Sequence, residues 1–156
     1  MNVQPFLIGE GWVEVRDGND TARDLFRRHY SCKKEGPAVG ADLLMLGPGD
    51  KMVLLTGDAR AVFAWRRERH RRDGQRGVEC TIFRNEGAGL SSALIKTAQA
   101  EADRRWPGER HFTHVDPGAV RGTCPGYCFI RAGWRPCGWT GVHRRRILQS
   151  LPEWRA

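Results

Sequence analysis

The residues from 78 to 92 combine the types and the spacing of an anion-binding loop. An apolar, strand-like run ends at Phe83, the segment Arg-Asn-Glu-Gly-Ala-Gly follows at 84–89, and a helix-like pattern starts at once. A helix start exposes unpaired backbone N–H groups and the positive end of the helix dipole, and glycines let an anion approach that backbone closely. The sequence thus predicts a phosphate-binding loop, and the expected cofactor-binding residues are Phe83, Arg84, Asn85, Glu86, Gly87, Ala88, Gly89, Ser91 and Ser92.

Two familiar phosphate-binding motifs do not match this loop. No Lys-Ser or Lys-Thr pair follows the glycines, as a P-loop requires, and the spacing differs from that of the dinucleotide-binding G-x-G-x-x-G. A purely structural alternative stays open, in which Gly87 and Gly89 only permit a tight turn from strand to helix.

A second group of polar side chains, His29-Tyr30-Ser31, lies where the first expected helix passes into a loop. These residue types move protons or donate hydrogen bonds, so they are candidates for catalytic work. The alternative is a helix C-terminus at which the dipole favours a histidine and the tyrosine simply packs.

Arginine gathers in two places. The segment 66–76 holds six arginines and only two acidic residues, and a second cluster lies near the C-terminus. Arginine suits bidentate contact with phosphate, and the formal net charge of +8 favours polyanionic partners. The alternative is a solvated hairpin face. The expected nucleic-acid contacts are Trp65, which would stack on a base, and Arg66, Arg67, Arg69, Arg71, Arg72, Arg144, Arg145 and Arg146.

The elements that must position these residues form one domain, 1–156, of mixed α/β (α+β) class. Asn19-Asp20-Thr21 offers caps for a helix that runs to about His29, and apolar spacing predicts a second helix over 90–105. A helix between two strand-like runs favours a parallel crossover. Strands are expected over 3–16 with a bend, 51–56, 60–65, 78–83, 111–115, 134–140 and 145–148, with a short helix over 127–132.

Composition narrows the remaining classes. No apolar run approaches the roughly 18 residues that span a bilayer, and no signal peptide is evident, so we expect a cytoplasmic protein without a membrane partner. Five cysteines, an odd number, argue against a disulfide framework, and we expect small buried thiols rather than a metal cluster.

The chain resembles the GNAT family of acyltransferases at two places. Arg84-x-x-Gly87-x-Gly89 matches the family's Q/R-x-x-G-x-G/A signature in its strand-loop-helix setting. The segment 125–135 is similar to the later part of that family, where a short helix with an aromatic residue runs into Gly-Phe and a strand. Trp134 replaces the more common Phe.

This resemblance implies a cofactor, acetyl-coenzyme A or another acyl-coenzyme A, whose pyrophosphate the amides of residues 85–89 would hold. It also implies a V-shaped splay between the strands at 78–83 and 111–115, which would receive the pantetheine arm. Tyr127 would lie near the thioester as a general acid toward the departing thiolate.

The string His29-Tyr30-Ser31 further resembles the Mom family of phage DNA-modification proteins, which place a carbamoylmethyl group on adenine N6 and so protect phage DNA from restriction. That resemblance implies double-stranded DNA as a partner and a location in the host cytoplasm. It adds Ser91 and Asp116 as site residues, and it leaves room for a metal ion to which the sequence assigns no ligands.

Two alternatives stay open at this point. One is a GNAT-type N-acetyltransferase that acts on a protein or small-molecule amine, with the basic surface recruiting an acidic acceptor. The other is a non-catalytic binding module that reuses the fold.

Overall fold

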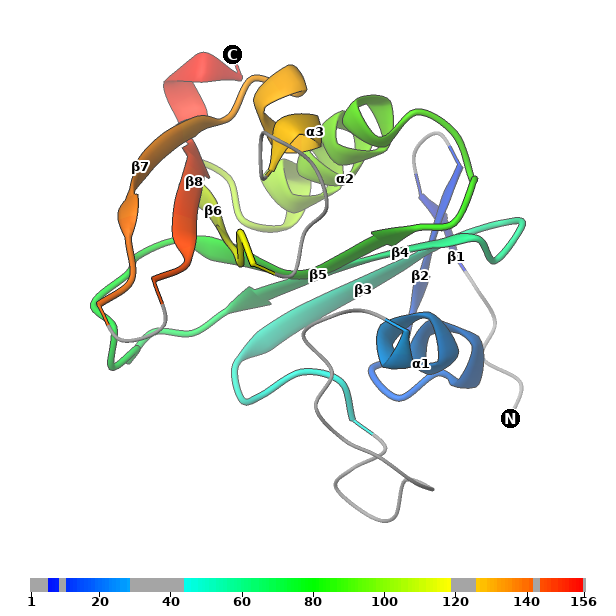
Figure 1. Ribbon diagram of the computed structural model, residues 1–156. Coiled ribbons are helices and arrows are strands. Elements are labelled where there is room, and N and C mark those ends of the chain that lie inside the picture. Colours follow the sequence, from blue (N-terminus) through cyan, green and yellow to red (C-terminus); the bar gives the residue numbers. More distant parts are fainter. Residues whose placement is uncertain (1–5, 9–10, 29–43, 119–125, 142–143, 156) are drawn as a thin grey trace.

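Strands rich in apolar residues build the centre of the molecule, and in β4 (Ala61–Arg67) the first five side chains are all buried. The computed structural model describes residues 6–8, 11–28, 44–118, 126–141 and 144–155. These residues form one mixed sheet of eight strands, in the order β1-β2-β3-β4-β5-β6-β8-β7 (Figure 1). The other strands are β1 (Phe6–Ile8), β2 (Trp12–Val15), β3 (Asp50–Thr56), β5 (Val78–Asn85), β6 (His111–Val115), β7 (Arg135–Trp139) and β8 (Arg146–Ser150).

Neighbouring strands pair antiparallel throughout this sheet except at β5 and β6, which are parallel. The helix α2 (Ser91–Arg105) connects them, as the sequence predicts for a parallel crossover. The last strand, β8, inserts between β6 and β7. The predicted mixed α/β class is therefore confirmed, and the expected bend over 3–16 is the β1–β2 hairpin.

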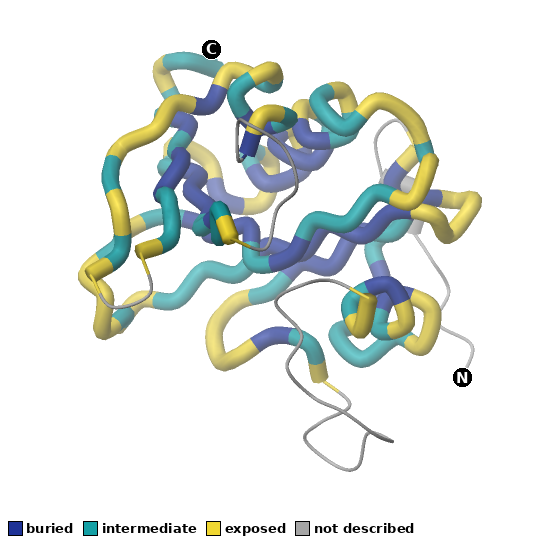
Figure 2. Tube along the Cα trace, in the orientation of Figure 1, coloured by how far each residue is buried: buried dark blue, intermediate teal, exposed yellow. Residues whose placement is uncertain are grey.

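Helices cover both faces of the sheet. Helix α2 and the short α3 (Tyr127–Arg131) lie on one face and α1 (Asp20–Arg27) lies on the other (Figure 1). The Asn19 side chain caps α1 by accepting a hydrogen bond from the Ala22 N–H at 3.1 Å, as the sequence predicts. The buried residues of the strands lie between these helices (Figure 2), where they form one core cluster under α2 and α3 and a smaller one under α1.

The two parallel strands separate along their length. Their paired register covers residues 78–80 of β5 and 111–113 of β6. Beyond that point β5 continues to Asn85 paired only with β4, while β6 continues paired with β8. This divergence at the carboxyl ends of the strands matches the predicted splay.

Several details differ from the expectations. A 3-10 helix, Pro152–Trp154, follows β8 where no element is predicted. Cys80 is buried as expected, but Cys137 is exposed because it lies on the edge strand β7. No helix of the described residues is long and apolar enough to cross a membrane.

Candidate active site

The loop between β5 and α2 has a backbone that requires its two glycines. Gly87 and Gly89 have φ values of +97° and +142°, a region that side chains with a Cβ rarely adopt. A Cβ added at Gly89 would meet no atom within 4 Å. The glycines therefore shape the turn, and the space in front of Gly89 is open to a ligand.

The side chain of Asn85 organises this loop from within. Its Oδ1 accepts hydrogen bonds from the N–H groups of Gly87 at 3.1 Å and Ala88 at 2.8 Å. Its Nδ2 donates to the Gly89 carbonyl at 2.7 Å and to Ser91 Oγ at 2.9 Å. An asparagine in a turn satisfies nearby backbone groups in this way.

This arrangement corrects part of the expected phosphate site. The N–H groups of Gly87 and Ala88 are occupied by Asn85, and the N–H of Glu86 donates to the Arg60 carbonyl at 2.7 Å. Because an N–H that already has a good acceptor gains little from a second one, these three amides are poor ligands for a pyrophosphate.

The start of α2 keeps its amides free. The N-cap residue, Leu90, makes no side-chain cap, and the first turn contains no acidic residue. The first helical hydrogen bond runs from Leu94 N–H to Leu90 C=O. Among the described residues, nothing accepts from the N–H groups of Gly89, Ser91 or Ser92. The anion-receptive position thus lies over 89–92, later in the loop than the sequence predicts.

Arg84 is committed to the protein rather than to a ligand. Its Nε donates to the Glu86 carboxylate, and its Nη1 donates to the Arg28 carbonyl at 2.8 Å. Arg28 in turn donates to both Glu86 oxygens, at 2.8 and 3.0 Å. The hydrogen bonds from Arg28 and then Arg84 lower the pKa of Glu86 to about 2, so the carboxylate stays charged and is shared by the two arginines.

These contacts tie the end of α1 to the phosphate loop. Arg28 is the C-cap residue of α1, and its partners Arg84 and Glu86 lie at the beginning of the loop. The C-terminal end of α1 and the loop at 84–89 are far apart in the sequence, and these contacts bring them together in the fold.

The remaining expected catalytic residues have different outcomes. His29, Tyr30 and Ser31 lie outside the described residues. Asp116 follows β6, where its Oδ1 accepts from the Gly118 N–H at 2.9 Å and shapes a turn. Tyr127 opens α3 with 58% of its surface exposed. In the part of the chain that the structure describes, no hydrogen bond joins Asp116 or Tyr127 to the loop at 84–89.

The position of α3 nonetheless places it beside the end of β5. Phe129 of α3 packs edge-on against Phe83 of β5, with ring centroids 6.0 Å apart. Phe83 also packs against Phe63 of the core at 5.3 Å. Its side chain is thus a core contact, and only its backbone faces the diverging edge of β5.

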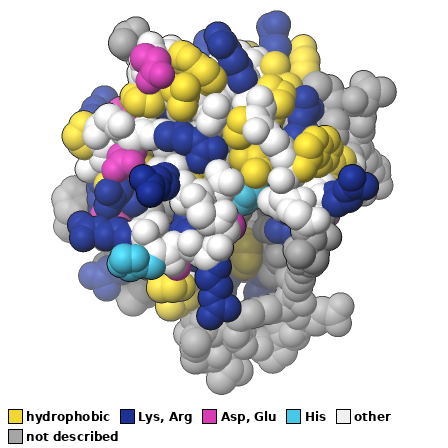
Figure 3. Space-filling view, turned by 90° about the vertical axis from the view of Figure 1, so that its left-hand side faces the viewer, with side chains coloured by type: hydrophobic (Ala, Val, Ile, Leu, Met, Phe, Trp, Pro, Cys, Tyr) yellow, Lys and Arg dark blue, Asp and Glu magenta, His cyan; other side chains and the backbone are white. Residues whose placement is uncertain are grey.

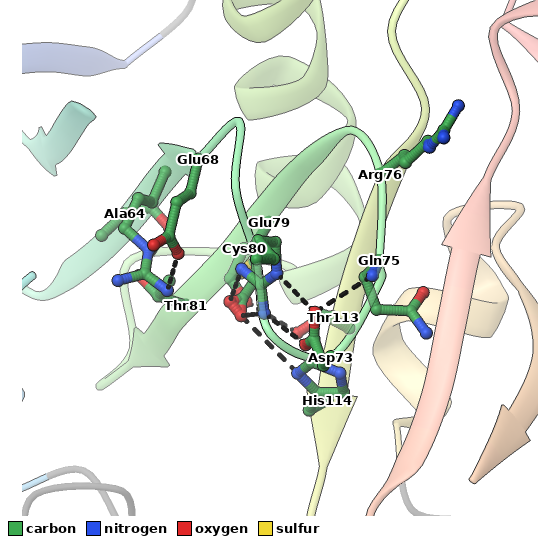
Figure 4. A network of polar contacts seen from close by, with 12 residues as sticks. Ala64, Glu68, Asp73, Gln75, Arg76, Glu79, Cys80, Thr81, Thr113 and His114 are labelled. Atoms are coloured by element: carbon green, nitrogen blue, oxygen red, sulfur yellow. Dashed lines mark hydrogen bonds and ion pairs between the residues drawn. The ribbon is translucent and has the colours of Figure 1, made fainter. Parts of the chain in front are cut away.

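A network of charged side chains joins the β4–β5 loop to β5 and β6 (Figure 4), and of its members the sequence singles out only Arg71. Arg71 donates to both oxygens of Glu79, at 3.1 and 3.2 Å, and to both oxygens of Asp73, at 2.9 and 2.7 Å. The Nδ1 of His114 lies 3.6 Å from Glu79 Oε1. The side chains of Arg71 and Glu79 are only 8% and 9% exposed.

Opposing effects set the ionisation of this network. Burial raises the pKa of Glu79, but the contacts with His114 and Arg71 outweigh it and hold that pKa below its ordinary value. The Arg71 hydrogen bond lowers the pKa of Asp73 to about 2. The one signal for Glu79 in the sequence is its position as a charged residue within an otherwise apolar strand.

The arginine run is partly structural. Arg66 pairs with Glu68 at 3.3 Å, and Arg67 pairs with Glu109 at 2.8 Å, in addition to the Arg71 contacts. Acidic residues outside the run thus neutralise part of its charge. A count of the acidic residues within 66–76 does not include them. The exposed arginines among the expected contacts are Arg69, Arg72 and Arg144, whereas Arg145 and Arg146 are half-buried.

The prediction that Trp65 stacks on a base is wrong. It is fully buried, its ring packs on Phe63, His111 and Trp134, and its Nε1 donates to the Ala98 carbonyl at 3.2 Å. Because β4 lies in the middle of the sheet, its aromatic residues fill the core under α2 and no base can reach them.

Comparisons with protein-family models, with curated proteins and with solved structures find no match for this chain. Within the described ranges, no group of three or more His, Cys, Asp or Glu residues is placed to hold a metal ion.

Proposed function

We propose that the chain is an acyl-coenzyme A-dependent transferase of the GNAT type that modifies the N6 amino group of adenine in DNA, similar to the Mom proteins. The observation that carries the proposal is the coincidence of two features at one place. The parallel strands β5 and β6 lose their pairing after Cys80 and Thr113. Just beyond the end of β5, α2 starts with amides that have no acceptor among the described residues.

Specific groups of this chain suit coenzyme A. The N–H groups of Gly89, Ser91 and Ser92 and the Ser92 hydroxyl would hold the pyrophosphate, since a helix start stabilises an anion. The backbone of residues 81–83, which has no pairing partner on the β6 side, would bind the amides of the pantetheine arm. The bound cofactor supplies an activated acyl thioester.

The acceptor would reach the opposite end of the splay. The exocyclic amine of adenine is accessible only when the base leaves the duplex, which requires a pocket near the thioester. The Arg28 contacts hold the C-terminal end of α1 beside the loop. His29 is our candidate to accept the amine proton, with Asp116 as the second candidate, and Tyr127 would protonate the departing thiolate.

A second candidate function is favoured by the arginine contacts. Arg66, Arg67 and Arg71 pair with carboxylates of the protein itself, and Trp65 is buried. Fewer side chains than the sequence indicates are thus available to DNA, which favours an N-acetyltransferase that acts on a protein or a small amine.

Nucleoside analysis separates the two functions. The chain would be expressed together with a plasmid, and the plasmid nucleosides would be analysed by mass spectrometry. Our proposal predicts a modified deoxyadenosine that disappears with the Ser92→Asp variant, in which a negative charge meets the pyrophosphate. Unaltered deoxyadenosine from well-folded protein, together with acetyl transfer to amines in the absence of DNA, would select the second function.

A further inference from the structure

One end of the molecule combines exposed arginines with an exposed tryptophan. We define this basic end as the β4–β5 loop (residues 68–77) and the β7–β8 hairpin (residues 135–141 and 144–150). In Figure 1 the two lie together beyond the edge of α2 and α3. The face turned toward the viewer in Figure 3 carries many Lys and Arg side chains and few Asp and Glu side chains.

Arg110 joins the two parts into one surface. Its Nη1 donates to the Arg76 carbonyl of the loop at 2.9 Å, and its Nε donates to Gln149 of β8 at 2.7 Å. Its Nη2 lies 3.6 Å from Cys137 Sγ of β7. Loop and hairpin are therefore held side by side, so one extended ligand can contact both.

The acidic residues of the loop pair with neighbouring arginines. Glu68 pairs with Arg66, and Asp73 pairs with Arg71. For the exposed Arg69, Arg72, Arg76 and Arg144, no carboxylate of the described residues lies within ion-pair distance. Figure 4 shows that the Arg76 side chain points away from the Arg71 network. These positive charges are thus directed to solvent and favour a polyanion.

Trp139 is the aromatic counterpart of these charges. It is the last residue of the edge strand β7, and 59% of its surface is exposed. A bulge between Pro136 and Gly138 changes the register just before it, and bulges commonly redirect a side chain. The ring is therefore accessible to a ligand from solvent.

We propose that the basic end binds single-stranded or locally unpaired nucleic acid, with Trp139 stacking on a base and Arg69, Arg72, Arg76 and Arg144 contacting phosphates. An aromatic ring beside a cationic groove is the general means of binding an unpaired strand. The choice of partner rests on the proposed function, which requires a base to leave the duplex. In this proposal the base-stacking residue is the exposed Trp139 of β7 and not the buried Trp65 of β4.

The test is fluorescence anisotropy of a fluorescein-labelled oligothymidylate of about 20 nucleotides, titrated with the full chain without coenzyme A. We expect Trp139→Ala to weaken binding about tenfold or more, because base stacking contributes about 1–3 kcal/mol, and Trp139→Phe to retain most of the affinity. Leu44→Ala, which removes an exposed apolar side chain far from the proposed sites in the sequence, is the control and leaves binding unchanged.

A matched pair of triple variants tests the charges. Replacing Arg69, Arg72 and Arg76 by Ala should lower the slope of log K against log salt by about 2, since each phosphate contact to a single strand contributes about 0.7. Replacing the exposed Arg16, Arg27 and Arg131 removes the same charge elsewhere and should change that slope far less.

The outcomes distinguish this inference from the proposed function. Native affinity of Trp139→Ala, or equal slopes for the two triple variants, would overturn the basic end as a nucleic-acid surface even if plasmid adenine is modified. Competition by polyglutamate as effective as that by the oligonucleotide would overturn it too, in favour of an acidic protein. Binding that depends on Trp139 without any modified nucleoside would leave this inference standing and refute the modification of adenine by this chain.

Discussion

At the scale of single residues, buried ion pairs contribute to the stability of the fold. Arg71 connects Glu79 and Asp73, and its guanidinium also lies 5.0 Å from the centre of the Phe112 ring. Arg110 lies on the same ring at 4.7 Å. A residue of the basic run thus acts as a structural clamp between the β4–β5 loop and the sheet.

Arg71→Ala should therefore destabilise the fold. The change leaves the Glu79 carboxylate buried without its cation, and removing one partner of a buried pair typically costs about 3 kcal/mol. Urea unfolding would measure the loss. Adding Glu79→Gln to the variant should recover part of it, because a neutral amide needs no counter-charge. A double variant that is less stable than Arg71→Ala alone would contradict this account.

At the scale of elements, the β5–α2 connection derives its shape from Asn85. One side chain fixes Gly87, Ala88, Gly89 and Ser91 through four hydrogen bonds. The glycines alone permit this turn but do not determine it. The open amides at the start of α2 are therefore a consequence of the order that Asn85 imposes on the preceding residues.

We expect Asn85→Ala to lower the free energy of unfolding by about 1–2 kcal/mol, since the amides of Gly87 and Ala88 lose their acceptor. It should also weaken coenzyme A binding, because the loop no longer holds one shape. Urea unfolding and calorimetry would measure the two effects. Asn85→Asp, which keeps an acceptor for both amides, should be the more stable variant, and the reverse order would contradict the assigned role.

The elements themselves were largely predictable, because they follow from local pattern. The residues 111–115 form the expected strand, and the helix expected over 90–105 begins at Ser91. Which polar groups pair across the sheet was not predictable. Glu109 neutralises Arg67 from 42 positions away, and Trp65 is buried because β4 is central, and neither fact is visible in a local window.

At the scale of the whole molecule, stability should fall with acid in two stages. Burial lowers the pKa of His111 from 6.5 to about 3, so the unfolded chain binds a proton that the folded chain refuses, and stability declines below pH about 6.5. The pKa of Asp73 is lowered from 3.8 to about 2 and that of Glu79 is lowered as well, so their contribution is lost below pH about 4.

Urea unfolding at a series of pH values tests this order. Between pH about 6 and 4 the native chain should lose roughly 1.4 kcal/mol per pH unit from His111 alone. His111→Gln should remove the first stage and retain the second. A variant with the same decline above pH about 4 as the native chain would show that another group is responsible.

The central claim is that an acyl-coenzyme A binds at the start of α2, and calorimetric titration with acetyl-coenzyme A tests it most directly. Ser92 lies in the first turn of α2 and is half-buried. Ser92→Asp favours the helix through its dipole but repels a pyrophosphate, whereas Ser92→Asn has the same size without the charge. We predict that the native chain and Ser92→Asn bind and that Ser92→Asp binds at least about tenfold more weakly. Equal affinity of the two variants, or no binding by the native chain, would contradict the claim.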